Sequence, residues 1–283
     1  MTTEAIEAQR REVYEIAEAI APTWERRRAD VEHATTAVRE WMLRELSPRA
    51  GDTVLELAAG VGDPGFDAAV LVGERGRVIS SDFSPAMLEA ARRRGAERGL
   101  GNVEYRVIDA ERIELDAGSV DGVLCRFGYM LMPEPAAALA ETRRVLRPGG
   151  RATLAVWGPL ERNPFFSTIG MSLVEHGHLP PPEPPGPPAF SLGSAPRLTA
   201  LLDGAGFSGV RTEEVPVCFE LPDVEEYLSL VADTSGPLGL VLQGLSEPDR
   251  EAVRHDVEAP LAAFAGERGY AIPGVALCAV AAR

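Results

Sequence analysis

The chain has 283 residues, 45% of them hydrophobic, so it can form one large α/β domain with an appended subdomain, or two small domains. Its formal net charge of −15 argues against a nucleic-acid partner, because an acidic surface repels phosphate backbones. No run of about 18 apolar residues occurs, so we expect no membrane span. Residues 1–11 are polar and do not resemble a signal peptide. We therefore expect a cytoplasmic protein whose partner is a small molecule.

The cysteine and histidine positions give no metal signal. Cys125, Cys218 and Cys278 are widely spaced, which disfavours a disulfide framework and a paired-cysteine metal site. Each lies in an apolar, strand-like run, so we expect all three to be buried. His176 and His178 are two positions apart beside a proline-rich run, a weak pattern for metal binding. We expect no metal site.

Two changes in the sequence pattern, after residues 47 and 158, divide the chain into three parts. Residues 4–46 read as helices, and we assign 1–47 to an N-terminal helical lid. Residues 48–158 alternate strands and helices, which is typical of a parallel sheet covered on both faces. The expected strands are 53–58, 77–82, 103–108, 120–125 and 151–157, and the expected helices between them are 66–72, 84–99 and 136–146. Ser84 is a good N-cap, with Pro85 at the first helical position.

The pattern changes in residues 159–283, which we expect to hold the rest of the sheet. A substrate-binding loop is expected over 159–195, and its proline-rich run, 180–188, predicts a stiff extended segment. A helical insertion is expected over 222–270. The remaining predicted elements are a helix at 195–205 and two strands, near 210–220 and at 274–282.

The most informative segment is the glycine-rich turn at 58–65, which follows the first strand. In open parallel sheets, ligands bind beyond the carboxyl ends of the strands, at turns of this kind. Glycine lets a ligand approach the backbone closely and permits positive φ. Asp82 ends the next strand, where a carboxylate can accept hydrogen bonds from both ribose hydroxyls of a nucleoside. A tight turn that binds no ligand is the plain alternative.

Two ligands that contain a nucleoside, NAD and S-adenosylmethionine, could explain this turn. Gly60-x-Gly62-x-x-Gly65 also matches the dinucleotide fingerprint, which would indicate NAD. However, Glu56 lies two residues before the turn, where a carboxylate would repel a pyrophosphate and face the amino-acid end of a cationic ligand. Asp109-Ala110 follows the third strand and could accept the adenine amino group. These acidic groups favour S-adenosylmethionine over NAD.

Five segments together resemble the class I S-adenosylmethionine-dependent methyltransferases, in particular the branch that includes ubiquinone/menaquinone-biosynthesis enzymes. They are VLELAAGVGDPG (54–65), VISSDFSPAML (78–88), VIDAERIEL (107–115), VDGVLCRFGYMLMPEP (120–135) and RVLRPGGRATLAVW (144–157). The resemblance implies an α/β, Rossmann-like, seven-stranded, mostly parallel sheet with helices on both faces. Its last strand is antiparallel, and the helical insertion precedes that strand.

The resemblance also implies roles for individual residues. Positions beside the methionine part, the ribose, the adenine and the substrate mouth of S-adenosylmethionine map onto Glu56, Ala58, Gly60, Gly62, Asp82, Phe83, Met87, Asp109, Ala110 and Arg126. Asp82 would hold the ribose, and Arg126 would lie near the methionine moiety. The sequence departs from the family at Ala58, where many members have glycine, and at Pro64, which removes an N–H from the turn.

The expected activity is methyl transfer to oxygen, nitrogen or carbon of a small molecule, such as a natural product or a quinone-like compound. Tyr129 and His178 are the candidate catalytic residues, because Tyr129 follows the fourth strand and His178 borders the proline-rich loop. Tyr14 and Trp24 are candidate lid residues over the cofactor. The alternatives are a cyclase or binding module of the same fold, and an NAD-dependent oxidoreductase. The acceptor, the methylated atom and the oligomeric state stay open, a homodimer included.

Overall fold

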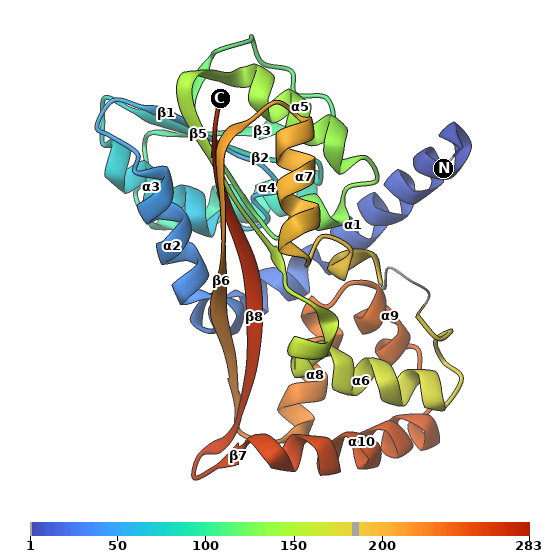
Figure 1. The fold of residues 1–283 in the computed structure, drawn as a ribbon. Helices are drawn as coiled ribbons and strands as arrows, with labels where there is room; N and C mark the ends of the chain where they lie inside the picture. Colours follow the sequence, from blue (N-terminus) through green and yellow to red (C-terminus); the bar gives the residue numbers. More distant parts are fainter. Residues whose placement is uncertain (1, 183–186) are drawn as a thin grey trace.

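The computed structural model describes residues 2–182 and 187–283 (Figure 1). The part of the predicted extended segment that falls on 183–186 lies outside the described residues. In the described residues, the sheet has the order β3-β2-β1-β4-β5-β8-β6, and the two-residue β7 pairs with β8. The strands are β1 (Thr53–Glu56), β2 (Arg77–Asp82), β3 (Val103–Val107), β4 (Val120–Arg126), β5 (Leu146–Trp157), β6 (Ser208–Leu221), β7 (Ala265–Gly266) and β8 (Gly269–Ala282).

The predicted sheet is confirmed, with one small addition. Strands β1 to β5 pair in parallel, and β8 runs antiparallel to both β5 and β6. The added element is β7, which forms a short hairpin with β8. The strand order reverses between β1 and β4, and a reversal of this kind opens a crevice at the carboxyl edge of a sheet.

Helices cover both faces of the sheet. One face carries α2 (Thr36–Leu46), α3 (Asp63–Val72) and α4 (Pro85–Glu97), and the other carries α5 (Pro135–Val145) and α7 (Ala195–Gly204). The predicted start of α4 is correct, because the Ser84 hydroxyl accepts a 3.1 Å hydrogen bond from the Met87 N–H. Parallel strands covered on both sides become almost fully buried, and Leu55 and Leu124 have no exposed surface.

A second group of helices surrounds the far ends of β6 and β8, which extend together beyond the rest of the sheet (Figure 1). It consists of α6 (Pro164–Glu175), α8 (Val224–Thr234), α9 (Pro237–Gln243) and α10 (Glu247–Leu261). The long helix α1 (Thr3–Ala34) packs against both α4 and α8, so it joins this group to the sheet. No helix in the described ranges has the length and apolarity needed to cross a membrane.

The cysteine prediction is partly wrong. Cys125 and Cys278 are buried, as expected, but Cys218 is exposed. Cys218 lies on β6, an edge strand in which Val217 and Phe219 point inward. Because successive side chains of a strand point to opposite faces, Cys218 faces outward.

Candidate functional site

The glycine-rich turn after β1 is held from the inside by Glu56. One Glu56 oxygen accepts a 2.7 Å hydrogen bond from the Gly65 N–H, and the other accepts one of 3.1 Å from the Ser80 hydroxyl. Burial raises the pKa of Glu56 to about 8, although both hydrogen bonds oppose this. The sequence predicted that this carboxylate faces the ligand. In the structure, the Glu56 side chain instead lies beneath the glycine-rich turn, where both of its oxygens accept hydrogen bonds.

Asp82 connects the end of β2 to the same turn. Its Oδ2 accepts a 2.9 Å hydrogen bond from the Gly60 N–H, and its Oδ1 accepts one of 2.9 Å from the Ser84 N–H. Burial raises the pKa of Asp82 to about 6, and the backbone N–H groups oppose the rise. The Phe83 N–H also stabilises this carboxylate, so three backbone groups of the two neighbouring turns meet at Asp82.

The turn itself has an unusual backbone. Ala58 has φ of +49°, a left-handed conformation in which the Cβ of an alanine is strained. Gly60, with φ of +53°, is covered by Trp24, whose indole nitrogen would lie 3.7 Å from an added Cβ, an ordinary contact distance. At Gly62, by contrast, the Phe66 ring occupies the space that an added Cβ would need. Many members of the family have glycine at the position of Ala58, and glycine would adopt this positive φ without strain.

The N-terminal half of α1 lies across the ends of β2 and β3. The Arg10 guanidinium is 3.6 Å from the Asp109 carboxylate, which follows β3. The Tyr14 ring meets the Phe83 ring edge to face, with 5.7 Å between centroids. Farther along, Glu18 accepts hydrogen bonds from the Ser84 hydroxyl and the Ala86 N–H at 2.5 and 3.1 Å. The helix thus follows the edge at which the sequence places the adenine and ribose.

The C-terminal half of α1 covers the glycine turn and the end of β4. Trp24 packs in a small apolar cluster with Val61 and Met87, beside Gly60. A little over two turns farther along, Glu32 forms a nearly buried ion pair with Arg126, the last residue of β4. Sequence analysis missed Glu18 and Glu32, because nothing in a charged helix distinguishes a carboxylate that meets the sheet from one that faces solvent.

A second unusual backbone occurs directly after β4. Phe127 has φ of +59°, which is rare for a bulky residue and marks a position worth explaining. Its ring stacks on Trp157, the last residue of β5, with 4.2 Å between centroids and 16° between planes. The next residue, Gly128, lies against Ala58, so the chain after β4 passes close to the glycine turn.

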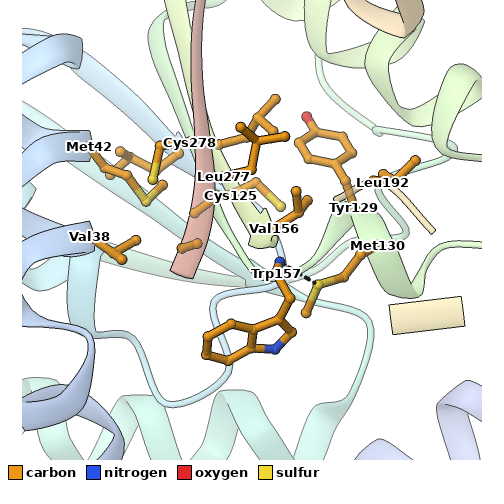
Figure 2. Close-up of a cluster of buried hydrophobic side chains, with 14 of the residues drawn as sticks. Val38, Met42, Cys125, Tyr129, Met130, Val156, Trp157, Leu192, Leu277 and Cys278 are labelled. Carbon is orange, nitrogen blue, oxygen red and sulfur yellow. Dashed lines mark hydrogen bonds between the residues drawn. The ribbon is translucent and has the colours of Figure 1, made fainter. Parts of the chain in front are cut away.

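Tyr129, the first candidate catalytic residue, lies in the core. Only 1% of Tyr129 is exposed, and its hydroxyl shares a 2.6 Å hydrogen bond with the Thr142 hydroxyl of α5. Burial raises the pKa of this hydroxyl well above its usual value. Figure 2 shows Tyr129 among buried apolar side chains, on the opposite side of β5 from Val38 and Met42. Tyr129 therefore belongs to the core, although its sequence position suggested the binding edge.

His178 also lies apart from the glycine turn. Its Nε2 is 3.8 Å from an Asp249 oxygen, and the His176 Nε2 is 2.7 Å from an Asp256 oxygen. Both aspartates belong to α10, and both histidines follow α6 directly. The pair thus connects two helices of the group around β6 and β8 (Figure 1). The predicted catalytic role of His178 gains no support from this placement.

The remaining predicted positions do come together. These residues lie around the carboxyl ends of the central strands, with Asp109 and Ala110 after β3 and Tyr14 and Trp24 on α1: Ala58, Gly60, Gly62, Asp82, Phe83, Met87 and Arg126. A glycine turn, a carboxylate at the end of the next strand and an apolar neighbour, Met87, are groups that suit a ribose and an adenine. The order of the sheet is that of the class I, S-adenosylmethionine-dependent methyltransferase fold.

Comparison with known proteins agrees with that class. Residues 54–150 match the family model of the methyltransferase domain. A demethylmenaquinone methyltransferase from Clavibacter sepedonicus is 38% identical over 135 residues, which is 48% of this chain and 49% of that protein. A ubiquinone/menaquinone biosynthesis C-methyltransferase from Francisella philomiragia is 38% identical over 104 residues, which is 36% of this chain and 42% of that protein.

A solved structure extends the match beyond the conserved segment. A SAM-dependent methyltransferase from Aquifex aeolicus has a TM-score of 0.53 and 25% identity, and the match covers 69% of this chain and 92% of that one. These matches identify residues 54–150 as a methyltransferase domain and support a class I S-adenosylmethionine-dependent methyltransferase. The chain spans about half the length of the two enzymes of quinone biosynthesis that it matches.

Proposed function

We propose that this protein transfers a methyl group from S-adenosylmethionine to a small-molecule acceptor. The observation that carries the proposal is the hydrogen bond between Asp82 and the Gly60 N–H, which joins the acid at the end of β2 to the glycine turn at the reversal of strand order. A nucleoside at this turn would then meet the backbone of the turn and a hydroxyl acceptor at the same place.

Each part of the cofactor has candidate residues in this crevice. Asp82 would accept from the ribose hydroxyls, and Phe83 and Met87 would flank the adenine. Asp109 would meet the adenine edge, and Arg126 the methionine end. When bound, S-adenosylmethionine supplies a methyl group already activated by the positive sulfur, so the protein acts mainly by holding two reactants in line.

The acceptor would approach at the ends of β4 and β5. Phe127 and Trp157 form a stacked aromatic pair there. Aromatic surface of this kind favours an apolar acceptor, such as a natural product or a quinone-like compound. Methylation at oxygen, nitrogen or carbon is compatible with it. Because Tyr129 is buried and His178 lies after α6, beside Asp249 of α10, we propose that positioning, rather than a base at either residue, drives the reaction.

The direct test is a methyl-transfer assay with methyl-labelled S-adenosylmethionine and a panel of apolar acceptors. We expect equal amounts of labelled product and S-adenosylhomocysteine, and we expect Asp82→Ala to abolish both. Conversion of an acceptor without S-adenosylhomocysteine would indicate a cyclase-like role, and a bound donor with no turnover would indicate a binding module. Bound NAD in place of the methyl donor would refute the proposal.

Two broader expectations accompany this proposal. The net charge of −15 supports a small molecule, rather than nucleic acid, as the partner. The composition and the resemblance support a cytoplasmic location. Size-exclusion chromatography with light scattering will distinguish a monomer from a homodimer.

A further inference from the structure

The residues expected beside the ribose and the adenine are covered by the first half of α1. Asp82 has an exposed fraction of only 5%, and Met87 one of 6%. The Tyr14 ring lies against the Phe83 ring, and Ile20 packs against the apolar cluster that contains Met87. A nucleoside cannot reach these positions while this half of the helix rests on them. The first half of α1 must therefore move before a ligand enters.

This first half, residues 3–20, is here called the N-terminal arm, and it is loosely packed. None of residues 3–20 is fully buried, whereas Ala21, Val31 and Ala34 in the rest of the helix are. Figure 1 shows the first turns of the arm projecting beyond the neighbouring helices. Segments that bury little apolar surface open at a low cost in free energy. The arm can therefore leave the sheet while the core stays folded.

Pro22 marks the point at which α1 can bend. Proline has no N–H, so the helix lacks one backbone hydrogen bond here, and this loss favours a kink. Directly after it, the Thr23 hydroxyl donates a 2.9 Å hydrogen bond to the Asp233 carbonyl, and Arg27 Nη1 is 2.8 Å from a Glu226 oxygen. Both partners belong to α8. The part of α1 after Pro22 is thus fastened to α8, independently of the arm.

Arg10 fastens the arm to the far edge of the sheet. Its guanidinium forms an ion pair with Glu111 and lies 3.6 Å from the Asp109 carboxylate and 3.8 Å from that of Glu134. Glu18 adds hydrogen bonds to the start of α4. Because 26% of the Arg10 side chain is exposed, water and salt reach these ion pairs and weaken them. The fastening can therefore be broken and remade.

We propose that the N-terminal arm is a gate for the methyl donor, hinged at Pro22 and latched by Arg10. The closed arm covers Asp82 and Met87, and the open arm leaves them accessible to the donor. Only the open fraction of the protein binds the donor, so the apparent association rate constant is reduced by that fraction. Arg10 thus sets how fast the donor enters. This inference rests on the proposed function, because the gate concerns the same donor.

Stopped-flow fluorescence gives the association rate constant of S-adenosylhomocysteine, with Trp24 beside the site as the reporter. With the ligand in excess, an unfolded fraction lowers the amplitude of the signal but not its rate. We expect Arg10→Gln to raise the association rate constant by about threefold to tenfold, because the open fraction rises. Arg11→Gln is the matched control, since Arg11 is an exposed neighbour on the same arm. Its rate constant should equal that of the wild type.

The hinge is tested by Pro22→Ala. Alanine restores the missing N–H and stiffens the helix, so we expect the association rate constant to fall by about threefold or more. 5′-Methylthioadenosine, which lacks the amino-acid end, should show the same changes in both variants, because the gate opens before any ligand contact forms.

Ionic strength tests the latch separately. S-adenosylhomocysteine has no net charge, so salt should affect its entry through the ion pairs of Arg10. Raising sodium chloride from about 20 mM to about 500 mM should speed association in the wild type but not in Arg10→Gln.

Three results would overturn the gate while leaving the proposed function intact. If Arg10→Gln binds S-adenosylhomocysteine no faster than the wild type, or if salt affects both proteins equally, Arg10 is not the latch. If Pro22→Ala binds as fast as the wild type, α1 does not bend at Pro22. Failure of the wild type to bind S-adenosylhomocysteine at all would instead refute the proposed function, and this inference with it.

Discussion

Glu56 and Gly65 are nine positions apart and share a buried hydrogen bond of 2.7 Å, from the Gly65 N–H to Glu56 Oε1. The bond fixes the end of β1 to the first turn of α3, so the glycine-rich segment between them has a set shape before any ligand arrives. Burial of the carboxyl raises its pKa, and the absence of a side chain at Gly65 makes room for it. Both features can be tested.

Glu56 should make stability depend on pH. Its pKa rises from 4.5 in an unfolded chain to about 8 in the fold, so the folded state keeps a proton that the unfolded state has lost. The free energy of unfolding should therefore fall as the pH rises from about 4.5 to about 8. Glu56→Gln keeps an acceptor for Gly65 but cannot titrate. Urea unfolding at pH 5 and pH 8 should show wild type losing roughly 2–4 kcal/mol relative to this variant. If the unfolding free energies of the wild type and Glu56→Gln changed equally with pH, the raised pKa of Glu56 would be contradicted.

Gly65→Ala should destabilise the protein. Although alanine favours helix, a Cβ at this position would overlap the Glu56 carboxyl group. We expect a loss of roughly 1–3 kcal/mol, from urea unfolding at pH 7. Gly170→Ala is the control, because Gly170 is also helical and has no atom within 4 Å of the added Cβ. That variant should gain up to about 1 kcal/mol from helix propensity. If Gly65→Ala and Gly170→Ala changed the free energy of unfolding equally, the overlap of the added Cβ with Glu56 would not be destabilising.

Ala58→Gly should stabilise the protein slightly. Ala58 has φ of +49°, and left-handed backbone costs an alanine roughly 1–2 kcal/mol. Glycine removes that strain, but it also makes the unfolded chain more flexible, which returns about half of the gain. We expect a net increase of about 0.5–1 kcal/mol in the free energy of unfolding. If Ala58→Gly were instead less stable than the wild type in both thermal and urea unfolding, the methyl group of Ala58 would have to pack favourably.

Trp24→Ala should weaken every adenosine ligand. Trp24 covers Gly60, so its removal opens the turn to water without touching the amino-acid end of a ligand. We expect affinities for S-adenosylhomocysteine and 5′-methylthioadenosine to fall together, by about tenfold, in calorimetry. Arg26→Ala, on the exposed side of α1, should bind as the wild type does. Tighter binding by Trp24→Ala would mean that the indole blocks the site instead of covering it.

Tyr129→Phe should leave turnover unchanged and lower stability. The Tyr129 hydroxyl bonds only to Thr142 in the core, so its loss should cost about 1 kcal/mol of unfolding free energy. The methyl-transfer rate should stay within about twofold of the wild type. A large fall in kcat with an unchanged melting temperature would restore the catalytic role that the sequence suggested.

Local spacing was sufficient to predict much of this molecule. The strands and helices of 48–158 follow from periodicity, and the start of α4 follows from Ser84 and Pro85, because capping depends on residues within one turn. The glycine turn and Asp82 were also found from sequence, since glycines after a strand and an acid at the next strand end are both local signals.

Side-chain direction and long-range partners were decided only by the tertiary structure. Glu56 and Cys218 lie in correctly predicted strands and Tyr129 follows one, yet each faces a different way from the one expected, because packing against distant elements sets which side is buried. The contact of Glu32 with Arg126 depends on how α1 crosses the sheet, and this crossing follows from the packing of α1 against α4 and α8. The amino-acid sequence thus determined the scaffold and the turn, and the packing of α1 determined which charges meet there.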